Sequence, residues 1–438
     1  MNLASNIADT LLGRNPVSTG SPQPLQSTTK FMHAITWQAK HDVKYEIVPQ
    51  PLLTHPNDAI IRVTAQSICG SDLHPYNGDM QGFRSGTILG HEFMGLVEEV
   101  GENCLLPLGA RVIVSCVIVC GQCEFCKAGK VFACETTNAS KVNEKLYGQP
   151  SPGLFGLGHL LGDYPGGMAE FVRVPHADYN CLMIPPSVRD DQALYITDVL
   201  PTSLHGCRNI QEGDTVAIWG MGPIGLMCAK WAQLKGAKRI IGISGTEYRL
   251  AHARKTMGIE TINYHNTDVV DELYKMEPKG VDVAIDCTGF RFAKNLSHRI
   301  QRAVGLESDT PETIYECVKA LKKYGTLNVI ASYTGFANAF PIGFFFIKEL
   351  TLTSGGVPVQ TLWRECLARI EDGSIDPRMI VTHYMKLSEA AVGYKEMNDH
   401  EDGMIKSFIR PDYIANAERG HENGRAILDL PPGISNMA

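Results

Sequence analysis

Two different patterns of apolar and polar positions divide the chain. From Phe31 to about Pro186, short stretches such as DAIIRVTAQSI and HEFMGLVEEVG carry β-branched and apolar residues and are bounded by Gly, Asp and Asn. This pattern is typical of short strands joined by turns. The sequence therefore predicts a β-rich region over this part of the chain.

From about Asp198 the pattern alternates between strand and helix character. Strand-like runs such as DTVAIWG, AKRIIGIS, VDVAIDCTG and TLNVIAS are separated by the helical runs PIGLMCAKWAQLKG, EYRLAHARKTMG and TIYECVKALKKYG. Such alternation implies right-handed crossovers and a parallel sheet covered by helices on both faces. After about Gly355 the elements are mixed again and include one more helical run, QTLWRECLARIEDG.

The two ends of the chain are predicted to lie outside these regions. Residues 1–30 are rich in Ser, Thr, Pro and Gln, have little to bury, and are expected to form a flexible extension. They lack the pattern of a secretory signal, and Asp9 together with a single arginine, Arg14, argues against a transit peptide. Residues 413–438 are expected to form a surface tail.

Composition narrows the class of protein. The 438 residues suggest two or three domains, and 40 Lys and Arg against 47 Asp and Glu leave a net charge of −7. A nucleic-acid-binding protein normally carries a basic surface, so no nucleic-acid partner is expected. No membrane partner is expected either, because Lys348 and Glu349 interrupt the apolar stretch around Phe344–Ile347 well short of the ~20 residues of a membrane span.

The 13 cysteines favour reduced thiols and metal binding over disulfides. Their number is odd, no secretory signal precedes them, and four of them lie within residues 120–134, which together predict a cytoplasmic protein. The cluster CGQCEFCKAGKVFAC contains Cys120, Cys123, Cys126 and Cys134. Four thiolates suit a tetrahedral zinc ion that is structural, since no coordination position remains for a substrate. An iron–sulfur cluster and reduced cysteines without metal are the alternatives.

A second candidate metal site is split along the chain. The stretch ICGSDLH supplies Cys69, and GHE supplies His91 with Glu92 next to it. One thiolate and one imidazole fit a catalytic zinc ion, which keeps a position open for water or a substrate oxygen. A buried cysteine and a core histidine without metal are the alternative.

A glycine-rich turn predicts dinucleotide binding. The stretch GMGPIG follows a strand-like run and opens a helical run, which is the context that this fingerprint requires. Gly220 allows the tight turn, Gly222 lets the backbone approach the pyrophosphate, and Gly225 permits close packing of helix and sheet. Pro223 and Ile224 begin the helix, whose first N–H groups would face the phosphates.

The residues after the next strand indicate which dinucleotide is bound. About 19 residues beyond Gly225, where NAD enzymes place an Asp or Glu for the ribose 2′-hydroxyl, stands Ser244. Ser244, the Gly245 backbone and Thr246 are able to donate hydrogen bonds to a 2′-phosphate, and Arg249 is able to add a charge. Glu247 is the counter-argument, because it could bind the ribose instead. NADP(H) is therefore favoured over NAD(H).

Along the chain the motifs follow one another as Cys69, the GHE stretch, the four-cysteine cluster and the glycine-rich turn. In that order they resemble the zinc-containing medium-chain alcohol dehydrogenase family, over nearly all of residues 31–412. The resemblance implies an α/β protein in which a GroES-like, β-rich catalytic domain is split around a Rossmann domain with a doubly wound parallel sheet. The catalytic domain would comprise 31–197, with the zinc lobe 120–134, and 356–412, and the Rossmann domain would comprise 198–355. It also implies two zinc ions per chain, NADP(H) or NAD(H), a small alcohol or carbonyl substrate, and a homo-oligomer, either a dimer or a tetramer.

The third zinc ligand departs from the commonest family pattern, which has a cysteine. Here Asp198 precedes x-x-P-T-x-x-H-G, which resembles the subgroup that includes glutathione-independent formaldehyde dehydrogenases. A carboxylate is a competent zinc ligand, although Asp198 could instead cap the helix that follows. Glu92 resembles a family residue that lies near the metal and occasionally binds it as a fourth ligand.

The resemblance also implies reversible hydride transfer between an alcohol carbon and the nicotinamide ring. Ser71 would contact the substrate oxygen and pass its proton to His74, while Asp72 would orient His91. Thr202 and Thr288 are further candidates for cofactor binding. Three alternatives stay open: an NAD-dependent formaldehyde dehydrogenase or dismutase, a zinc-free reductase of enones or quinones, and a non-catalytic redox sensor that binds a dinucleotide.

Overall fold

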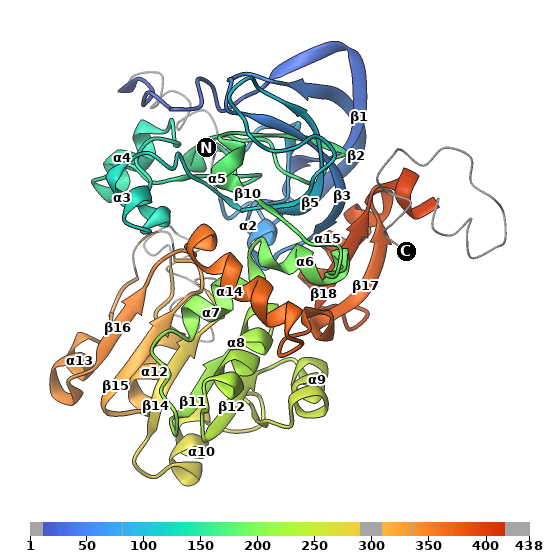
Figure 1. Cartoon of the computed structure of the whole chain (residues 1–438). Coiled ribbons are helices and arrows are strands. Elements are labelled where there is room, and N and C mark those ends of the chain that lie inside the picture. The colour runs from blue at the N-terminus through green and yellow to red at the C-terminus, as the bar shows by residue number, and fades with distance from the viewer. Residues whose placement is uncertain (1–11, 81, 290–308, 334, 336, 417–438) are drawn as a thin grey trace. The chain divides into compact units, whose positions relative to one another are not determined.

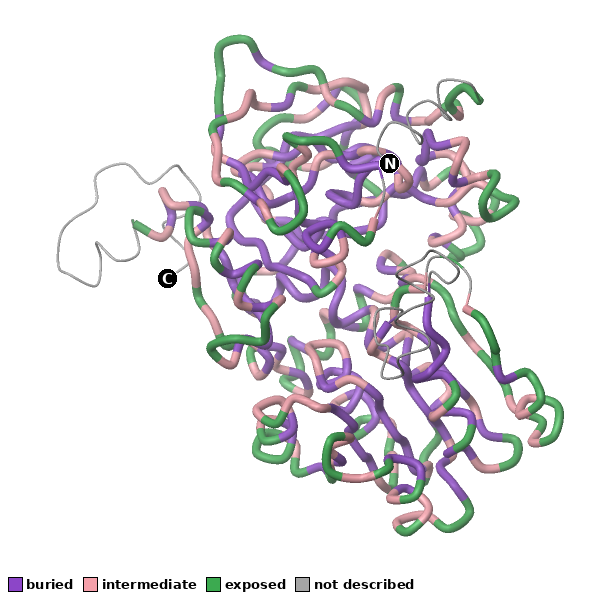
Figure 2. The backbone as a smooth tube through the Cα atoms, turned by 180° about the vertical axis from the view of Figure 1, so that it is seen from behind, coloured by how far each residue is buried: buried purple, intermediate pink, exposed green. Residues whose placement is uncertain are grey.

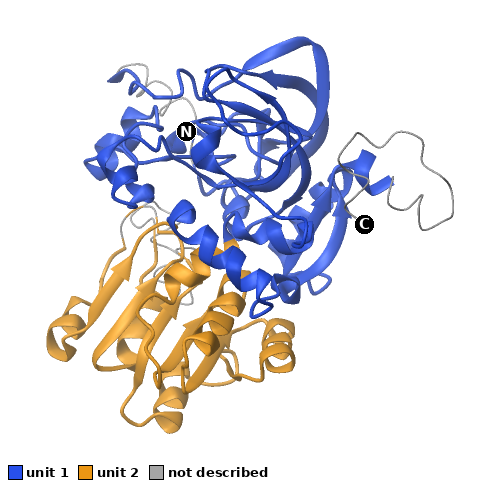
Figure 3. Ribbon diagram, viewed as in Figure 1, with its two compact units in different colours: residues 1–198, 358–438 blue, residues 199–357 orange. Residues whose placement is uncertain are grey.

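The computed structural model describes residues 12–80, 82–289, 309–333, 335 and 337–416 (Figure 1). The chain divides into two compact units, residues 1–198 with 358–438 and residues 199–357 (Figure 3). The sequence places Asp198 at the start of the Rossmann part, whereas the structure groups it with the first unit. None of the helices in the described ranges combines the length and the apolar character that crossing a bilayer requires.

The first unit is built around a seven-stranded sheet with the order β10-β6-β5-β3-β18-β17, in which β9 also pairs with β3. Its strands are β3 (Ala59–Ser67), β5 (Glu92–Val100), β6 (Arg111–Val114), β9 (Phe171–Val174), β10 (Cys181–Met183), β17 (Val381–Lys386) and β18 (Lys406–Arg410). Strand β18 comes from the C-terminal part of the chain and pairs with β3 from the N-terminal part. The first unit is therefore split in sequence but continuous in space.

Two smaller sheets and several short helices complete this unit. The order β2-β1-β4 joins β1 (Leu25–Ala39), β2 (Asp42–Leu52) and β4 (Thr87–Ile88), and β7 (Val117–Ile118) pairs with β8 (Gly153–Leu154). The α-helices are α2 (Leu73–Tyr76), α3 (Glu124–Lys127), α4 (Lys141–Tyr147), α5 (Ala177–Asn180), α6 (Asp190–Ala193), α14 (Val359–Glu371) and α15 (Ala390–Asp399). Residues buried in the strands, purple in Figure 2, form the core, among them Ile61, Val63 and Phe93.

The N-terminal segment differs from the flexible extension expected over residues 1–30. Residues 1–11 lie outside the described part, but β1 begins at Leu25 and Thr19 is fully buried. The buried Arg173 guanidinium pairs with Asp58 (2.6 Å) and donates hydrogen bonds to the carbonyls of Thr19 (3.0 Å) and Ser21 (2.6 Å). Backbone carbonyls rather than apolar side chains anchor this segment, which explains why its composition gave no sign of it.

The second unit is a six-stranded parallel sheet with the order β13-β12-β11-β14-β15-β16. This is the 3-2-1-4-5-6 order of the doubly wound dinucleotide-binding fold, as the sequence predicts. The strands are β11 (Thr215–Trp219), β12 (Arg239–Ser244), β13 (Glu260–Asn263), β14 (Val281–Asp286), β15 (Leu321–Val329) and β16 (Thr351–Ser354). The helices are α7 (Val199–Gly206), α8 (Pro223–Leu234), α9 (Glu247–Met257), α10 (Val269–Met276), α12 (Glu312–Ala320) and α13 (Ile342–Lys348).

One boundary in this unit differs from the sequence prediction. The run TIYECVKALKKYG is expected to be helical up to Gly325, but α12 ends at Ala320 and β15 begins at Leu321. The pairing with β14 then shifts, since Leu321 lies opposite Val281 and Thr326 opposite Val283. Leu321 ends the helical path, because its backbone is already extended with φ −65° and ψ 142°. Tyr324 in the intervening bulge then has a positive φ of 61°.

Candidate active site and metal centres

The register between β3 and β5 brings the predicted zinc ligands together. Ser67, the last residue of β3, lies opposite Glu92, the first residue of β5. The segments that follow β3 and precede β5 are therefore neighbours, and these segments carry Cys69 and His91. Asp198 completes the group: its Oδ2 lies 3.6 Å from Cys69 Sγ and 3.5 Å from His91 Nε2.

Asp198 reaches this position from the short 3-10 helix η4 (Leu194–Ile196). The next residue, Thr197, accepts the N–H of Cys116 through its carbonyl at 3.3 Å, which ties this segment to the chain after β6. The candidate ligand atoms of Cys69, His91, Glu92 and Asp198 all lie within 4.8 Å of one another, and all four residues are buried.

Asp72 orients two of these residues at once. It ends the 3-10 helix η1 (Gly70–Asp72) and is fully buried. Its Oδ2 accepts the backbone N–H of Cys69 at 2.9 Å, and its Oδ1 lies 3.0 Å from His91 Nδ1. This contact directs His91 Nε2 toward Asp198 and favours the tautomer in which Nε2 is free to bind a metal.

The electrostatics of this group favour a bound cation. Burial, reinforced by Glu92, raises the pKa of the Cys69 thiol. Burial lowers the pKa of His91, but the Asp72 charge and the hydrogen bonds with Asp72, Asp198 and Cys69 together outweigh it, and the net direction is upward. Without a cation, protons must therefore neutralise a site that gathers a thiol and several carboxyl groups away from water. One sulfur, one nitrogen and one carboxylate oxygen form a donor set that fits zinc.

Glu92 is bound by a residue that the sequence analysis did not identify. Lys406, the first residue of β18, donates a hydrogen bond from Nζ to Glu92 Oε1 at 2.7 Å and another to the carbonyl of Ile68 at 2.9 Å. Its ammonium also lies 2.6 Å from Glu92 Oε2. The two residues are 314 positions apart in sequence, and the only local signal is a charged residue inside an otherwise strand-like run, MIKSFIR.

Ser71 and His74 stand differently toward the cluster. Ser71 Oγ lies 3.2 Å from both Cys69 Sγ and His91 Nε2, so this hydroxyl touches the candidate ligands. His74 lies on α2, and its Nδ1 is 3.8 Å from Asp79 Oδ2 with 15% of the side chain exposed. The transfer of a proton from Ser71 to His74 stays a prediction.

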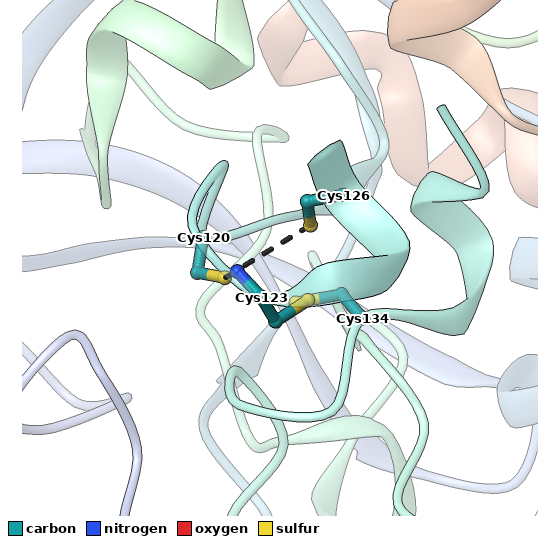
Figure 4. A group of neighbouring side chains, drawn as sticks. All are labelled: Cys120, Cys123, Cys126 and Cys134. Atoms are coloured by element: carbon teal, nitrogen blue, oxygen red, sulfur yellow. Dashed lines mark hydrogen bonds between the residues drawn. The ribbon is translucent and has the colours of Figure 1, made fainter. Parts of the chain in front are cut away.

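The four cysteines of the lobe form a second group of donors (Figure 4). Cys123 precedes α3, Cys126 lies on it, and Cys134 follows the 3-10 helix η2 (Val131–Ala133). Cys120 Sγ lies 3.9 Å from Cys126 Sγ and accepts two backbone N–H groups, from Gln122 and Cys123, each at 3.3 Å. All four sulfurs lie within 4.8 Å of one another. Backbone N–H groups directed at sulfur fit thiolates, and four thiolates fit a closed zinc site.

The glycine-rich turn in the second unit has the geometry that phosphate binding needs. Gly220 has φ 92°, and a Cβ on Gly225 would lie 1.9 Å from the Gly220 carbonyl oxygen, so no side chain is tolerated there. A Cβ on Gly222 would meet only Arg249 Nη1, at 3.9 Å. The backbone at Gly222 is therefore open on the side where the Arg249 guanidinium lies, and α8 begins there with Pro223 and Ile224 in its first turn.

The end of β12 carries the candidate ribose site. Ser244 Oγ accepts the N–H of Thr246 at 3.2 Å. A Cβ on Gly245 would lie 2.3 Å from the Tyr264 ring, so a side chain there would require Tyr264 to move. The Glu247 carboxylate accepts hydrogen bonds from Arg254 (2.6 Å) and Asn263 (3.0 Å).

The two further candidate residues lie on elements of the same unit. Thr288 follows β14 and donates from its N–H (2.8 Å) and its hydroxyl (2.7 Å) to Asp286 Oδ1. Thr202 lies on α7.

Comparison with known proteins decides the family. Residues 55–186 match the model of the alcohol dehydrogenase GroES-like domain, and residues 223–372 match that of the zinc-binding dehydrogenases. A zinc-type alcohol dehydrogenase-like protein of Schizosaccharomyces pombe is 43% identical over 93% of this chain and 98% of its own length. This chain belongs to the zinc-type alcohol dehydrogenase family. It is an enzyme of that class, a zinc-dependent oxidoreductase.

Other members of the family extend the comparison. A glutathione-independent formaldehyde dehydrogenase of Bacillus subtilis is 30% identical over 80% of this chain and 86% of its own. The alcohol dehydrogenase TADH of Thermus sp. ATN1 superposes with a TM-score of 0.74, is 29% identical, and covers 87% of this chain and all of its own. A structure described as a zinc-binding dehydrogenase of Sinorhizobium meliloti 1021 bound to NADP has a TM-score of 0.68 at 25% identity, covering 87% of this chain and all of its own. The expected split catalytic domain and Rossmann fold are confirmed.

Proposed function

We propose that this alcohol dehydrogenase holds its catalytic zinc with Cys69, His91 and Asp198 and transfers a hydride reversibly between an alcohol or carbonyl substrate and NADP(H). The observation that carries the proposal is the convergence of three buried donors of the right chemistry, two of them fixed by Asp72. When bound, zinc supplies a Lewis acid that favours ionisation of an alcohol or polarises a carbonyl group. The nicotinamide supplies the hydride chemistry, and the protein supplies binding and electrostatics.

The residues around the ligands would handle the proton. The Ser71 hydroxyl is placed at Cys69 and His91, where a substrate oxygen would have to approach. We infer that the Ser71 hydroxyl accepts the alcohol proton while it donates its own proton toward His74. His74 then releases a proton to water. Asp72 holds His91 as a metal ligand, so that His91 does not itself exchange the proton.

Three features support NADP(H) over NAD(H). Ser244 stands where a carboxylate would repel a 2′-phosphate. Glu247, the acidic residue three positions beyond Ser244, has both carboxylate oxygens engaged by Arg254 and Asn263. The Arg249 guanidinium lies beside Gly222, where it is able to pair with a phosphate. The Sinorhizobium relative, bound to NADP, shows that this cofactor occurs in a similar protein.

A formaldehyde dehydrogenase or dismutase is the second candidate function. It is favoured by Asp198 in its x-x-P-T context and by the Bacillus relative that carries the formaldehyde dehydrogenase name. The two functions differ in substrate and product. Incubation with formaldehyde and either cofactor, followed by assay of formate and methanol, separates them: formate production at a rate that exceeds oxidation of small alcohols would favour the second.

Two further parts of the proposal concern the lobe and the compartment. We propose that Cys120, Cys123, Cys126 and Cys134 hold a second, structural zinc, which gives two ions per chain.

We also propose a cytoplasmic location, because all 13 cysteines are unpaired, as expected for a reducing compartment.

We also propose a homo-oligomer. Strand β16 is the last strand at one edge of the six-stranded sheet, and Leu352 on it is 43% exposed. Helix α13, just before it, exposes Ile342 (69%), Phe346 (83%) and Ile347 (73%). Exposed apolar side chains next to the edge strand of a sheet, as among the described residues here, are typical of a surface that is covered in an assembly. Light scattering on the purified protein gives the oligomeric state, and a monomer at micromolar concentration would contradict the proposal.

A screen of alcohols, aldehydes and ketones with NADPH or NADP, before and after treatment with a chelator, tests the proposed function. We expect turnover that the chelator abolishes and that added zinc restores. Turnover that is insensitive to metal removal would contradict it.

A further inference from the structure

Lys406 is a fully buried ammonium group at the candidate active site. Only 1% of its side chain is exposed, and the Glu92 side chain is not exposed at all. Its Nζ contacts both oxygens of Glu92, at 2.7 and 2.6 Å, and the carbonyl of Ile68, at 2.9 Å. An isolated buried ammonium is very costly, so these contacts are what make the position tolerable.

The contacts of Lys406 reach both segments that carry zinc ligands. Glu92 follows His91 directly, and Ile68 precedes Cys69 directly. Strand β18, which begins with Lys406, pairs with β3 through Ile409 and Gln66 and thereby fixes the direction from which the ammonium approaches. Lys406 therefore holds Glu92 and the Cys69 segment in one arrangement.

Charge balance indicates what this arrangement does. The Cys69 thiolate and the Asp198 carboxylate carry two negative charges, which match the two positive charges of a zinc ion. Glu92 and Lys406 form a separate pair without net charge. If Glu92 bound the ion as well, three anionic ligands would exceed the charge of the metal, and the buried ammonium would lose its counter-charge.

We propose that Lys406 is a positioning residue that keeps Glu92 from binding the catalytic zinc, so that the fourth coordination position stays available to the substrate oxygen. The inference rests on the proposed function, because it presupposes a zinc ion on Cys69, His91 and Asp198. Glu92 is within reach of that ion, since its carboxylate lies within 4.8 Å of the other candidate ligand atoms. Because the Lys406 ammonium contacts both carboxylate oxygens, its removal would leave the buried Glu92 carboxylate without its counter-charge and able to turn to the metal.

The test uses the full-length enzyme loaded with cobalt(II), whose visible absorption reports the number and type of ligands. The variants are Lys406→Met, Lys406→Arg, Glu92→Gln and the double variant Lys406→Met/Glu92→Gln. The spectrum of a Cys69→Ser variant is subtracted from each, so that only the site on Cys69 contributes. We expect Lys406→Met to change the spectrum and to slow metal release to a chelator at least about tenfold. Lys406→Arg should retain the wild-type spectrum, and the double variant should regain it.

Two results would overturn the inference. One is a Lys406→Met spectrum and release rate equal to those of the wild type. The other is a change in the spectrum on Glu92→Gln alone, because it would mean that Glu92 already binds the metal. If Lys406→Met does not fold, Glu92→Gln decides: an unchanged spectrum supports the inference and a changed one overturns it. The proposed function fails separately, if wild type and Cys69→Ser give the same cobalt spectrum.

Discussion

The Asp72 carboxylate lies 3.0 Å from His91 Nδ1 and accepts the N–H of Cys69 with its other oxygen, at 2.9 Å. One buried side chain thus sets the orientation of an imidazole and the path of the backbone at a thiol. Because Nδ1 faces Asp72, Nε2 faces Asp198 across 3.5 Å. Cys69 and His91, the two candidate ligands at neighbouring strand ends, are therefore fixed relative to each other before a metal binds.

Replacement of Asp72 by asparagine should weaken metal binding more than it weakens the fold. The amide keeps the size of the side chain but loses the charge that supports His91 as a ligand. We expect zinc affinity to fall by about 10- to 100-fold, as for other groups that orient metal-binding histidines. Competition with a chromophoric chelator measures it. Asp191→Asn, which breaks an ion pair with the exposed Arg189, is the matched control and should leave the affinity unchanged.

Loss of a thiol should have different consequences at the two metal sites. Cys123→Ala opens a closed four-thiolate site, and we expect the Tm to fall by at least about 5 °C because such sites contribute folding energy directly. Cys69→Ala should abolish turnover and shift the Tm much less. Calorimetry and the turnover assay on both variants check this. Equal loss of Tm in the two variants would mean that the sites do not divide into structural and catalytic roles.

Cofactor preference should depend on Arg249 and Ser244. We expect the wild type to use NADP(H) with the higher kcat/KM. Arg249→Ala should reduce kcat/KM for NADP(H) by at least about tenfold, or ~1.4 kcal/mol, and change that for NAD(H) little. Ser244→Asp should shift the preference toward NAD(H) through repulsion of the 2′-phosphate. A wild-type preference for NAD(H) of about tenfold or more would contradict the assignment.

His205 on α7 should make the second unit sensitive to acid. Burial, with Arg208 nearby, lowers the pKa of His205 from 6.5 to about 4. Between these values the unfolded chain binds a proton that the folded chain does not, so stability is full above pH 6.5 and falls as the pH drops toward 4. His205→Gln should remove this loss, which we expect to be on the order of 2 kcal/mol after allowance for partial exposure.

The measurement for His205 is urea unfolding at a series of pH values. The difference in free energy of unfolding between wild type and His205→Gln should shift in favour of the variant as the pH falls. His265→Gln changes an exposed histidine in the same unit and is the control. A constant difference between wild type and His205→Gln across this range would show that His205 titrates alike in the folded and unfolded chain.

The sequence predicts well those parts of the fold that are determined by residues adjacent in the chain. The strand β11, the turn Gly220–Gly225 and the helix α8 follow one another directly, and each has a local cause: apolar β-branched residues, positive φ, and proline in the first turn. The end of α12 was missed because the apolar spacing continues to Leu321. There the pairing with β14, rather than the local pattern, starts the strand.

Only those residues of the candidate site that lie in recognisable motifs could be predicted from the sequence. Cys69 and His91 lie in short motifs, and Asp198 was identified through the family resemblance, but nothing near Glu92 points to Lys406. That pair forms because β18 is placed beside β3 when the chain folds, which brings together residues 314 positions apart. Arg173 is a similar case: besides Asp58, its partners are backbone carbonyls, such as that of Thr19, and amino-acid composition does not reveal a carbonyl as a partner.

The zinc content of Asp198→Ala, measured beside the wild type, tests the central claim most directly. If Asp198 is the third ligand of a catalytic ion and the four-cysteine lobe holds a separate one, the wild type contains two zinc ions per chain and the variant contains one. The variant should keep its NADPH affinity, which belongs to the second unit, while turnover is lost. A variant that retains two zinc ions per chain and normal turnover would contradict the account.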